Sequence, residues 1–174
     1  MKRLVADTGP LLHLHEAGAL HLLPLIGQVV VPPLVLDELG RNAGALLPKK
    51  LPSWLTVRGL SAANRARSSA WQQAGLLHGG EADALALCAE TAPDWFLTDD
   101  AAARLMASSI GIETHGSLGV VLGAAATRLI EVRAADLHLA ALEQSTLWIS
   151  PRVRAEARTA LVAIGKRHTP GKPA

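Results

Sequence analysis

The sequence lacks the residues that cysteine-based or membrane-spanning architectures require. Cys88 is the single cysteine among 174 residues, which excludes an intramolecular disulfide and a cysteine-rich zinc site and suits a reducing cytoplasm. Aromatic residues make up only 3%, and Tyr is absent, so Leu, Val and Ala must form the core. No apolar run reaches the roughly 18 residues of a membrane span. Asp7 interrupts the N-terminus before the apolar region of a signal peptide could form. We therefore expect a cytoplasmic protein without a membrane segment.

Acidic and basic residues occupy different segments of the chain. No acid occurs between Leu39 and Gly80, whereas residues 81–100 contain acids and no base, and residues 151–174 are mostly basic again. The net charge of +2 is too small to identify a partner. Its distribution, however, is typical of an acidic centre framed by positive surface, as in a metal-dependent enzyme that acts on a polyanion.

Carboxylates follow two predicted buried strands. The strand at 3–6 is followed by Asp7 and Thr8, and the strand at 95–97 by Thr98, Asp99 and Asp100, each before a helix-forming segment. Ligands bind at the carboxyl ends of the strands in open α/β sheets. The simpler alternative is that Asp99 or Asp100 only caps the helix that follows. Further strands are expected at 28–31, 54–57 and 110–114.

Two predicted helices bring further acids. In the helix at 34–39 we expect Glu38 to point inward with the apolar residues and Asp37 to face solvent. The helix that follows Gly79 and Gly80 carries Glu81 and Asp83, which point about 160° apart on a regular helix. Both cannot face one site, and Glu81 is expected to reach it only from the bend before the helix.

Clustered carboxylates repel one another unless a cation compensates them. An all-oxygen cluster selects Mg²⁺ or Mn²⁺ rather than zinc, and the sequence has no glycine-rich phosphate loop. Such ions activate water and stabilise both oxygens in phosphoryl transfer. Hydrolysis of a phosphodiester therefore fits the acids and the basic segments best.

The four acidic segments together resemble the motifs of PIN-domain proteins, and in particular the VapC-type toxin ribonucleases of toxin–antitoxin pairs. The segments are Val5-Ala6-Asp7-Thr8, Leu36-Asp37-Glu38-Leu39, Gly80–Leu87 and Leu97-Thr98-Asp99-Asp100. The resemblance implies a three-layer α/β/α fold around a mostly parallel sheet of four or five strands. It also implies a Mg²⁺-dependent endoribonuclease, often dimeric, that is restrained by a small antitoxin protein.

The resemblance also implies roles for particular residues. By position, the catalytic acids are Asp7, Glu38, Asp83 and Asp100, with Asp99 and Glu81 as possible substitutes. Thr8 and Thr98 could orient water or a carboxylate. The implied metal ligands are Asp7, Asp83, Asp99 and Asp100. The candidate RNA contacts are Arg41, Lys49, Lys50, Arg65, Arg67 and Arg104.

The expected organisation is a nuclease domain at 1–150 and a basic C-terminal helix and tail at 151–174, with residues 166–174 disordered. The tail could contact RNA, the antitoxin or a second copy. The main alternative is a non-catalytic PIN-like module that binds RNA or protein, although all four acid positions are filled. A phosphatase would need a second Asp where Gly9 stands, and a receiver domain a lysine between Lys50 and Lys166.

Overall fold

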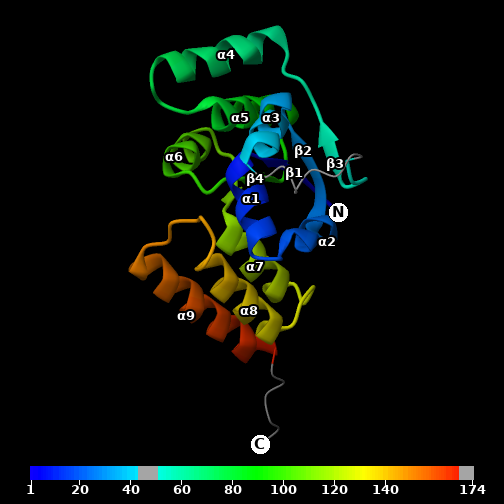
Figure 1. Ribbon diagram of the computed structural model, residues 1–174, viewed down its shortest axis with the longest axis vertical. Helices are drawn as coiled ribbons and strands as arrows, with labels where there is room; N and C mark the ends of the chain where they lie inside the picture. The colour runs from blue at the N-terminus through cyan, green and yellow to red at the C-terminus, as the bar shows by residue number, and fades with distance from the viewer. Residues whose placement is uncertain (43–50, 169–174) are drawn as a thin grey trace, which may run out of the picture.

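The computed structural model describes residues 1–42 and 51–168. At its centre lies a five-stranded sheet in the order β3-β2-β1-β4-β5, in which all neighbouring strands are parallel (Figure 1). The strands are β1 (Lys2–Ala6), β2 (Gly27–Val31), β3 (Leu55–Val57), β4 (Trp95–Leu97) and β5 (Thr114–His115). The expected α/β fold with a parallel sheet is therefore confirmed.

The buried strands contribute side chains to two separate cores. Successive strand residues point to opposite faces of the sheet, so Leu4 and Leu97 join one apolar cluster whereas Val5 and Phe96 join the other. Because both faces are apolar, both must be covered by helices, which gives the three-layer arrangement.

The helices divide between the two faces according to the core that they enter. The first core receives α1 (Thr8–Glu16), η1 (Leu20–Leu22), α2 (Leu23–Ile26), α3 (Pro33–Asn42), α7 (Ser117–Ala126), α8 (Val132–Leu142) and α9 (Pro151–His168). The second core receives α5 (Gly79–Thr91) and α6 (Ala101–Ser109), with α4 (Ala62–Gln73) packed outside α5. Among the described residues, no helix is long and apolar enough to cross a bilayer.

Two expectations about element boundaries are wrong. The last strand starts at Thr114 rather than at residue 110, because α6 continues to Ser109 and Gly111 then turns the chain at a positive φ of 75°. At the C-terminus, α9 continues to His168, so residues 166–168 are helical, and the rest of the tail that was expected to be disordered, 169–174, lies outside the described residues. The division at residue 150 into a nuclease domain and a tail remains a prediction.

The strand order reverses beside β1. β2 lies on one side of β1 and β4 on the other, and Ala6 is in register with Leu97. Asp7 therefore emerges next to Thr98, and the Asp7 amide donates to the carbonyl oxygen of Leu97 at 3.0 Å. A reversal of this kind opens the crevice at which α/β sheets bind ligands.

Candidate functional site

Asp7 is a buried carboxylate at this reversal point. Its Oδ1 accepts a hydrogen bond from the Gly9 amide at 3.1 Å and so caps α1, and the residue is only 2% exposed. Burial raises the pKa of Asp7 well above its ordinary value, and the negative charges of Asp99 and Glu81 raise it further. Hydrogen bonds from Thr98 and Gly9 offset part of this rise. Asp7 thus stands among acids with too little compensation for its charge.

Glu38 is held from two sides, as an inward-facing acid of α3. It accepts a hydrogen bond from the Thr8 hydroxyl, and its Oε1 accepts one from the Gly80 amide at 3.0 Å. A Cβ at residue 80 would collide with the Glu38 carboxylate, so a larger residue there would have to displace that carboxylate. Asp37 is exposed, which confirms that Glu38 points inward and Asp37 outward.

Glu81 lies in the first turn of α5 and faces other carboxylates of the site. We call the carboxylates whose charges act on one another here the acidic group: Asp7, Glu38, Glu81, Asp99 and Asp100. Its Oε2 accepts from the His78 amide at 2.8 Å, which is one half of a capping box. Burial raises the pKa of Glu81, and the charges of Asp100 and Glu38 add to the rise. Glu81 belongs to the helix itself and not to the bend before it, and its role in the site remains a prediction.

Asp83 points elsewhere. Its Oδ1 accepts from the Ser68 hydroxyl at 2.5 Å, and Ser68 is buried on α4. The divergence of Glu81 and Asp83 follows from their spacing on the helix. As placed, Asp83 fastens α4 to α5 and does not join the acidic group around Asp7, so its role in catalysis and metal binding remains a prediction.

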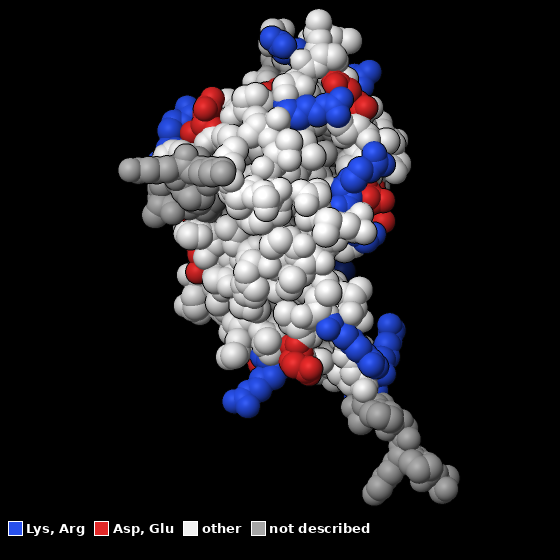
Figure 2. Space-filling view, turned by 90° about the vertical axis from the view of Figure 1, so that its right-hand side faces the viewer, with Lys and Arg blue, Asp and Glu red and all other residues white. Residues whose placement is uncertain are grey.

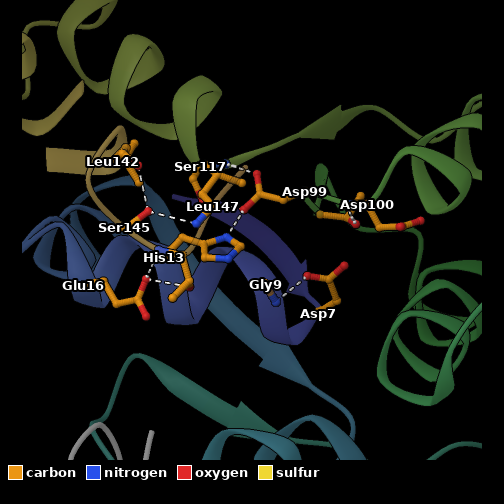
Figure 3. A network of polar contacts seen from close by, with 12 residues as sticks. Asp7, Gly9, His13, Glu16, Asp99, Asp100, Ser117, Leu142, Ser145 and Leu147 are labelled. Atoms are coloured by element: carbon orange, nitrogen blue, oxygen red, sulfur yellow. Dashed lines mark hydrogen bonds and ion pairs between the residues drawn. The ribbon is translucent and has the colours of Figure 1, made fainter. Parts of the chain in front are cut away.

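Asp99 accepts three hydrogen bonds (Figure 3). The donors are His13 Nδ1 at 2.8 Å, the Ser117 amide at 2.7 Å and the Ser117 hydroxyl at 2.6 Å. Burial acts to raise the pKa of Asp99, but the hydrogen bonds from His13 and Ser117 outweigh it, and the pKa is lowered. Neither His13 nor Ser117 could be assigned to this site from the sequence, because no spacing pattern links α1 or α7 to residue 99.

Asp100 both caps a helix and belongs to the acidic group. Its Oδ1 accepts from the Ala103 amide at 2.7 Å, which caps α6, and its amide donates to the Thr98 hydroxyl at 3.1 Å. Its charge also raises the pKa of Glu81. Asp100 therefore caps the helix that follows, and its role in the site remains a prediction.

The candidate RNA contacts differ in their distance from the acids. Arg104 lies beside Asp99, where its Nε donates to the Thr98 carbonyl oxygen at 3.2 Å. Arg65 lies on α4 and donates to the Leu60 carbonyl oxygen at 3.1 Å. Arg41 and Arg67 are exposed on α3 and α4. Lys49 and Lys50 lie outside the described residues.

Basic side chains form no continuous patch on the face that Figure 2 shows. Lys and Arg lie around its margin, often next to acids, and its centre carries few charges. Several bases that the sequence placed around the acidic centre are paired. Arg58 lies 3.3 Å from Glu90, and Arg158 bonds to Asp136 and Glu143. Arg104 is therefore the candidate contact best placed for a ligand at the acids.

The acidic group suits a divalent cation in chemistry. Its oxygen donors are those that Mg²⁺ and Mn²⁺ prefer, and a bound cation would relieve the repulsion that raises the pKa values of Asp7 and Glu81. Among the described residues, no three His, Cys, Asp or Glu side chains lie close enough to hold a metal ion. Joint coordination therefore requires the carboxylates to rotate toward one another.

Comparison with known proteins identifies the family. A family model described as PIN domain matches residues 3–162, which include every acid discussed above. No curated protein matches the chain. PIN domains are generally nucleases. Because the match covers most of the sequence, the chain belongs to the PIN-domain family.

Proposed function

We propose that this protein is an endoribonuclease that hydrolyses RNA phosphodiester bonds with Mg²⁺ or Mn²⁺. The observation that carries the proposal is Asp7, a buried carboxyl whose pKa is raised by burial and by the charges of Asp99 and Glu81. Negatively charged side chains that gather where the strand order of a parallel sheet reverses are typical of a cation-binding site. Membership of a family of nucleases supports hydrolysis as the reaction.

The residues that would hold the cation are Asp7, Glu81, Asp99 and Asp100, with Asp83 kept as a candidate by its motif position. A bound divalent ion lowers the pKa of a water ligand and stabilises the attacking and leaving oxygens. Hydrogen bonds from Thr8 and Gly80 hold the Glu38 carboxylate in place. It can therefore accept a proton as a general base or accept a hydrogen bond from a water molecule. Arg104 provides positive charge for an RNA phosphate next to Asp99.

A finer proposal rests on the resemblance to VapC-type proteins. We propose that the protein is the cytoplasmic toxin of a type II toxin–antitoxin pair, acts as a homodimer and is restrained by a small antitoxin. Induced expression in bacteria should then arrest growth, and Asp7→Asn should restore growth at an equal protein level. Arrest by both forms would contradict a toxicity that depends on catalysis.

Cleavage of an end-labelled RNA with both single-stranded and paired regions tests the reaction. We expect cutting with Mg²⁺ or Mn²⁺, no cutting with chelator, and no cutting by the double variant Asp7→Asn/Asp100→Asn. Asp37→Asn removes an exposed acid of α3 and is the matched control, which should cut like the parent. A double variant that cuts as fast as the parent would refute the acidic centre. RNA binding without cleavage under either metal would favour the non-catalytic module.

A further inference from the structure

A groove opens directly beside the acidic group. Its volume is about 590 Å³, and it lies between α6, β5 and the first half of α7 on one side and the segment 147–150 with the start of α9 on the other. In Figure 1 the orange segment that leads into α9 lies on the side of α9 that faces α6. The residues that matter here are Asp99, Arg104, His115, Trp148 and Val153.

Trp148 lines this groove and is largely exposed. It is 84% exposed, whereas Trp95 is 9% exposed. The segment before it is anchored, because the amide and hydroxyl of Thr146 both donate to Glu16 on α1 at 2.8 Å. The Leu147 amide also donates to the Ser145 hydroxyl at 3.2 Å (Figure 3). An indole that is exposed on a fixed segment is a preformed stacking surface.

Charges of both signs line the groove. The carboxylates of Asp99 and Glu156 lie in its wall, and each has a partner: His13 Nδ1 lies 2.8 Å from Asp99 Oδ2, and Arg152 Nε lies 2.8 Å from Glu156 Oε1. The His115 Nε2 atom lies 2.7 Å from Oε1 of Glu113. Within the described part of the chain, no carboxylate forms an ion pair with Arg104, which lines the groove beside Asp99. The groove therefore combines a stacking surface with a cation, which is how proteins bind single-stranded nucleic acid.

We propose that Trp148 stacks on a base of single-stranded RNA while Arg104 binds the neighbouring phosphate, so that the groove seats the nucleotide next to the cleavage point. The inference rests on the proposed function and names the residues that would seat the nucleotide. Asp99 belongs both to the groove and to the acidic group, so the two are continuous. A base inside a duplex is stacked on its neighbours and cannot lie on an indole, whereas an unpaired base can.

Binding without catalysis tests this assignment. Fluorescein-labelled octamers of uridine and of adenosine are titrated with the full chain in chelator, and anisotropy is recorded. Trp148→Ala should weaken binding of both RNAs by about 5- to 100-fold, and Trp148→Phe should restore most of the affinity. Leu137→Ala removes a side chain of α8 that is 64% exposed, lies outside the groove and should leave the affinity unchanged.

Two further readouts separate stacking from a structural role. RNA should quench the tryptophan fluorescence of the parent, and Trp148→Phe should abolish most of that quenching while it keeps the affinity. Arg104→Gln should weaken binding and lower the salt dependence of log Kd by about 0.7 for each phosphate that the variant no longer neutralises. Equal affinities of the parent and Trp148→Ala would overturn the inference.

The failure of the inference is distinguishable from that of the proposed function. If the parent cuts RNA only with metal but Trp148→Ala binds and cuts like the parent, the groove assignment is wrong and the nuclease proposal stands. If the parent neither binds nor cuts RNA, both are wrong. If Trp148→Ala turns a dimer into a monomer in light scattering and leaves RNA affinity unchanged, the groove holds a second copy, and the inference is overturned.

Discussion

Replacing Asp7 by Asn tests whether neighbouring acids destabilise the folded chain. Asn caps helices about as well as Asp, so the variant keeps the acceptor for the Gly9 amide and loses only the negative charge. The lost attraction to the N-terminus of α1 costs about 0.3 to 1 kcal/mol. Burial, which is the largest influence on the pKa of Asp7, acts in the opposite direction, and so do Asp99 and Glu81. We therefore expect the Asn variant to have the larger free energy of unfolding at pH 7 in chelator.

The sign of the pH dependence follows from the direction of the pKa shift. The folded chain binds the Asp7 proton more tightly than the unfolded chain does, because the folded-state pKa is raised above the ordinary value of 3.8. The stability contributed by the protonated group is fully present below pH 3.8 and is lost as the pH rises through the folded-state pKa. The advantage of the Asn variant should thus grow with pH, by at most about 1.4 kcal/mol per pH unit.

Urea unfolding of the parent and the variant between pH 3.5 and 8, followed by circular dichroism, measures this difference. Asp37→Asn is the control and should show a difference from the parent that hardly changes with pH, because Asp37 is exposed on α3. Asp7→Ala should be about 0.5 to 2 kcal/mol less stable than Asp7→Asn, because it also loses the cap. Added Mg²⁺ should stabilise the parent more than the Asn variant. An advantage of Asp7→Asn that shrinks as the pH rises would refute the reasoning.

Three further predictions concern the surroundings of the site. Glu81→Gln should lower the RNA cleavage rate at least about tenfold, and by more than Asp83→Asn does. The reason is that Glu81 faces the other acids, whereas Asp83 bonds to Ser68. If Asp83→Asn lowers the single-turnover cleavage rate as much as Glu81→Gln or more, Asp83 belongs to the catalytic centre. Gly80→Ala should lower cleavage because its Cβ displaces Glu38, whereas Gly123→Ala on α7 meets only an ordinary contact and should leave both cleavage and the fold intact. The pKa of Glu90 is lowered from 4.5 to about 2 by hydrogen bonds from Ser61 and Asn64, so the stability it contributes is present above pH 4.5 and is lost as the pH falls toward 2. The protection factors of the α4 amides, which compare each exchange rate with that of an unfolded peptide at the same pH, should therefore fall over that range in the parent and change less with pH in Glu90→Gln.

The strand-end acids could be predicted from the sequence because their positions depend on local pattern. Apolar runs define β1 and β4, and parallel strands bring their carboxyl ends to one edge, so Asp7 and Asp99 had to lie near each other. The inward direction of Glu38 likewise followed from its place in an apolar helix. The local pattern of apolar and polar residues was enough to predict these features.

The rest of the site depends on tertiary packing that local pattern does not encode. The spacing of Glu81 and Asp83 predicted that they diverge, but the direction of each was set by where α5 docks, beside α4 and α3. His13 meets Asp99 across 86 positions of the chain. The groove at Trp148 arises only because α9 returns along α7 and α8.

The central position of β1 has a consequence for synthesis of the protein. β1 is made first, but its neighbour β4 follows about 90 residues later, and the hydrogen bonds of Asp99 wait for Ser117. Long-range strand pairings of this kind form late, because the entropy cost of closing a long loop comes before the stabilising contacts form. A nascent chain on the ribosome therefore carries Asp7 without its partners until β4 and α7 have emerged. If the protein cuts RNA, it is harmless to the messenger that encodes it until Ser117 has been translated and has left the ribosome.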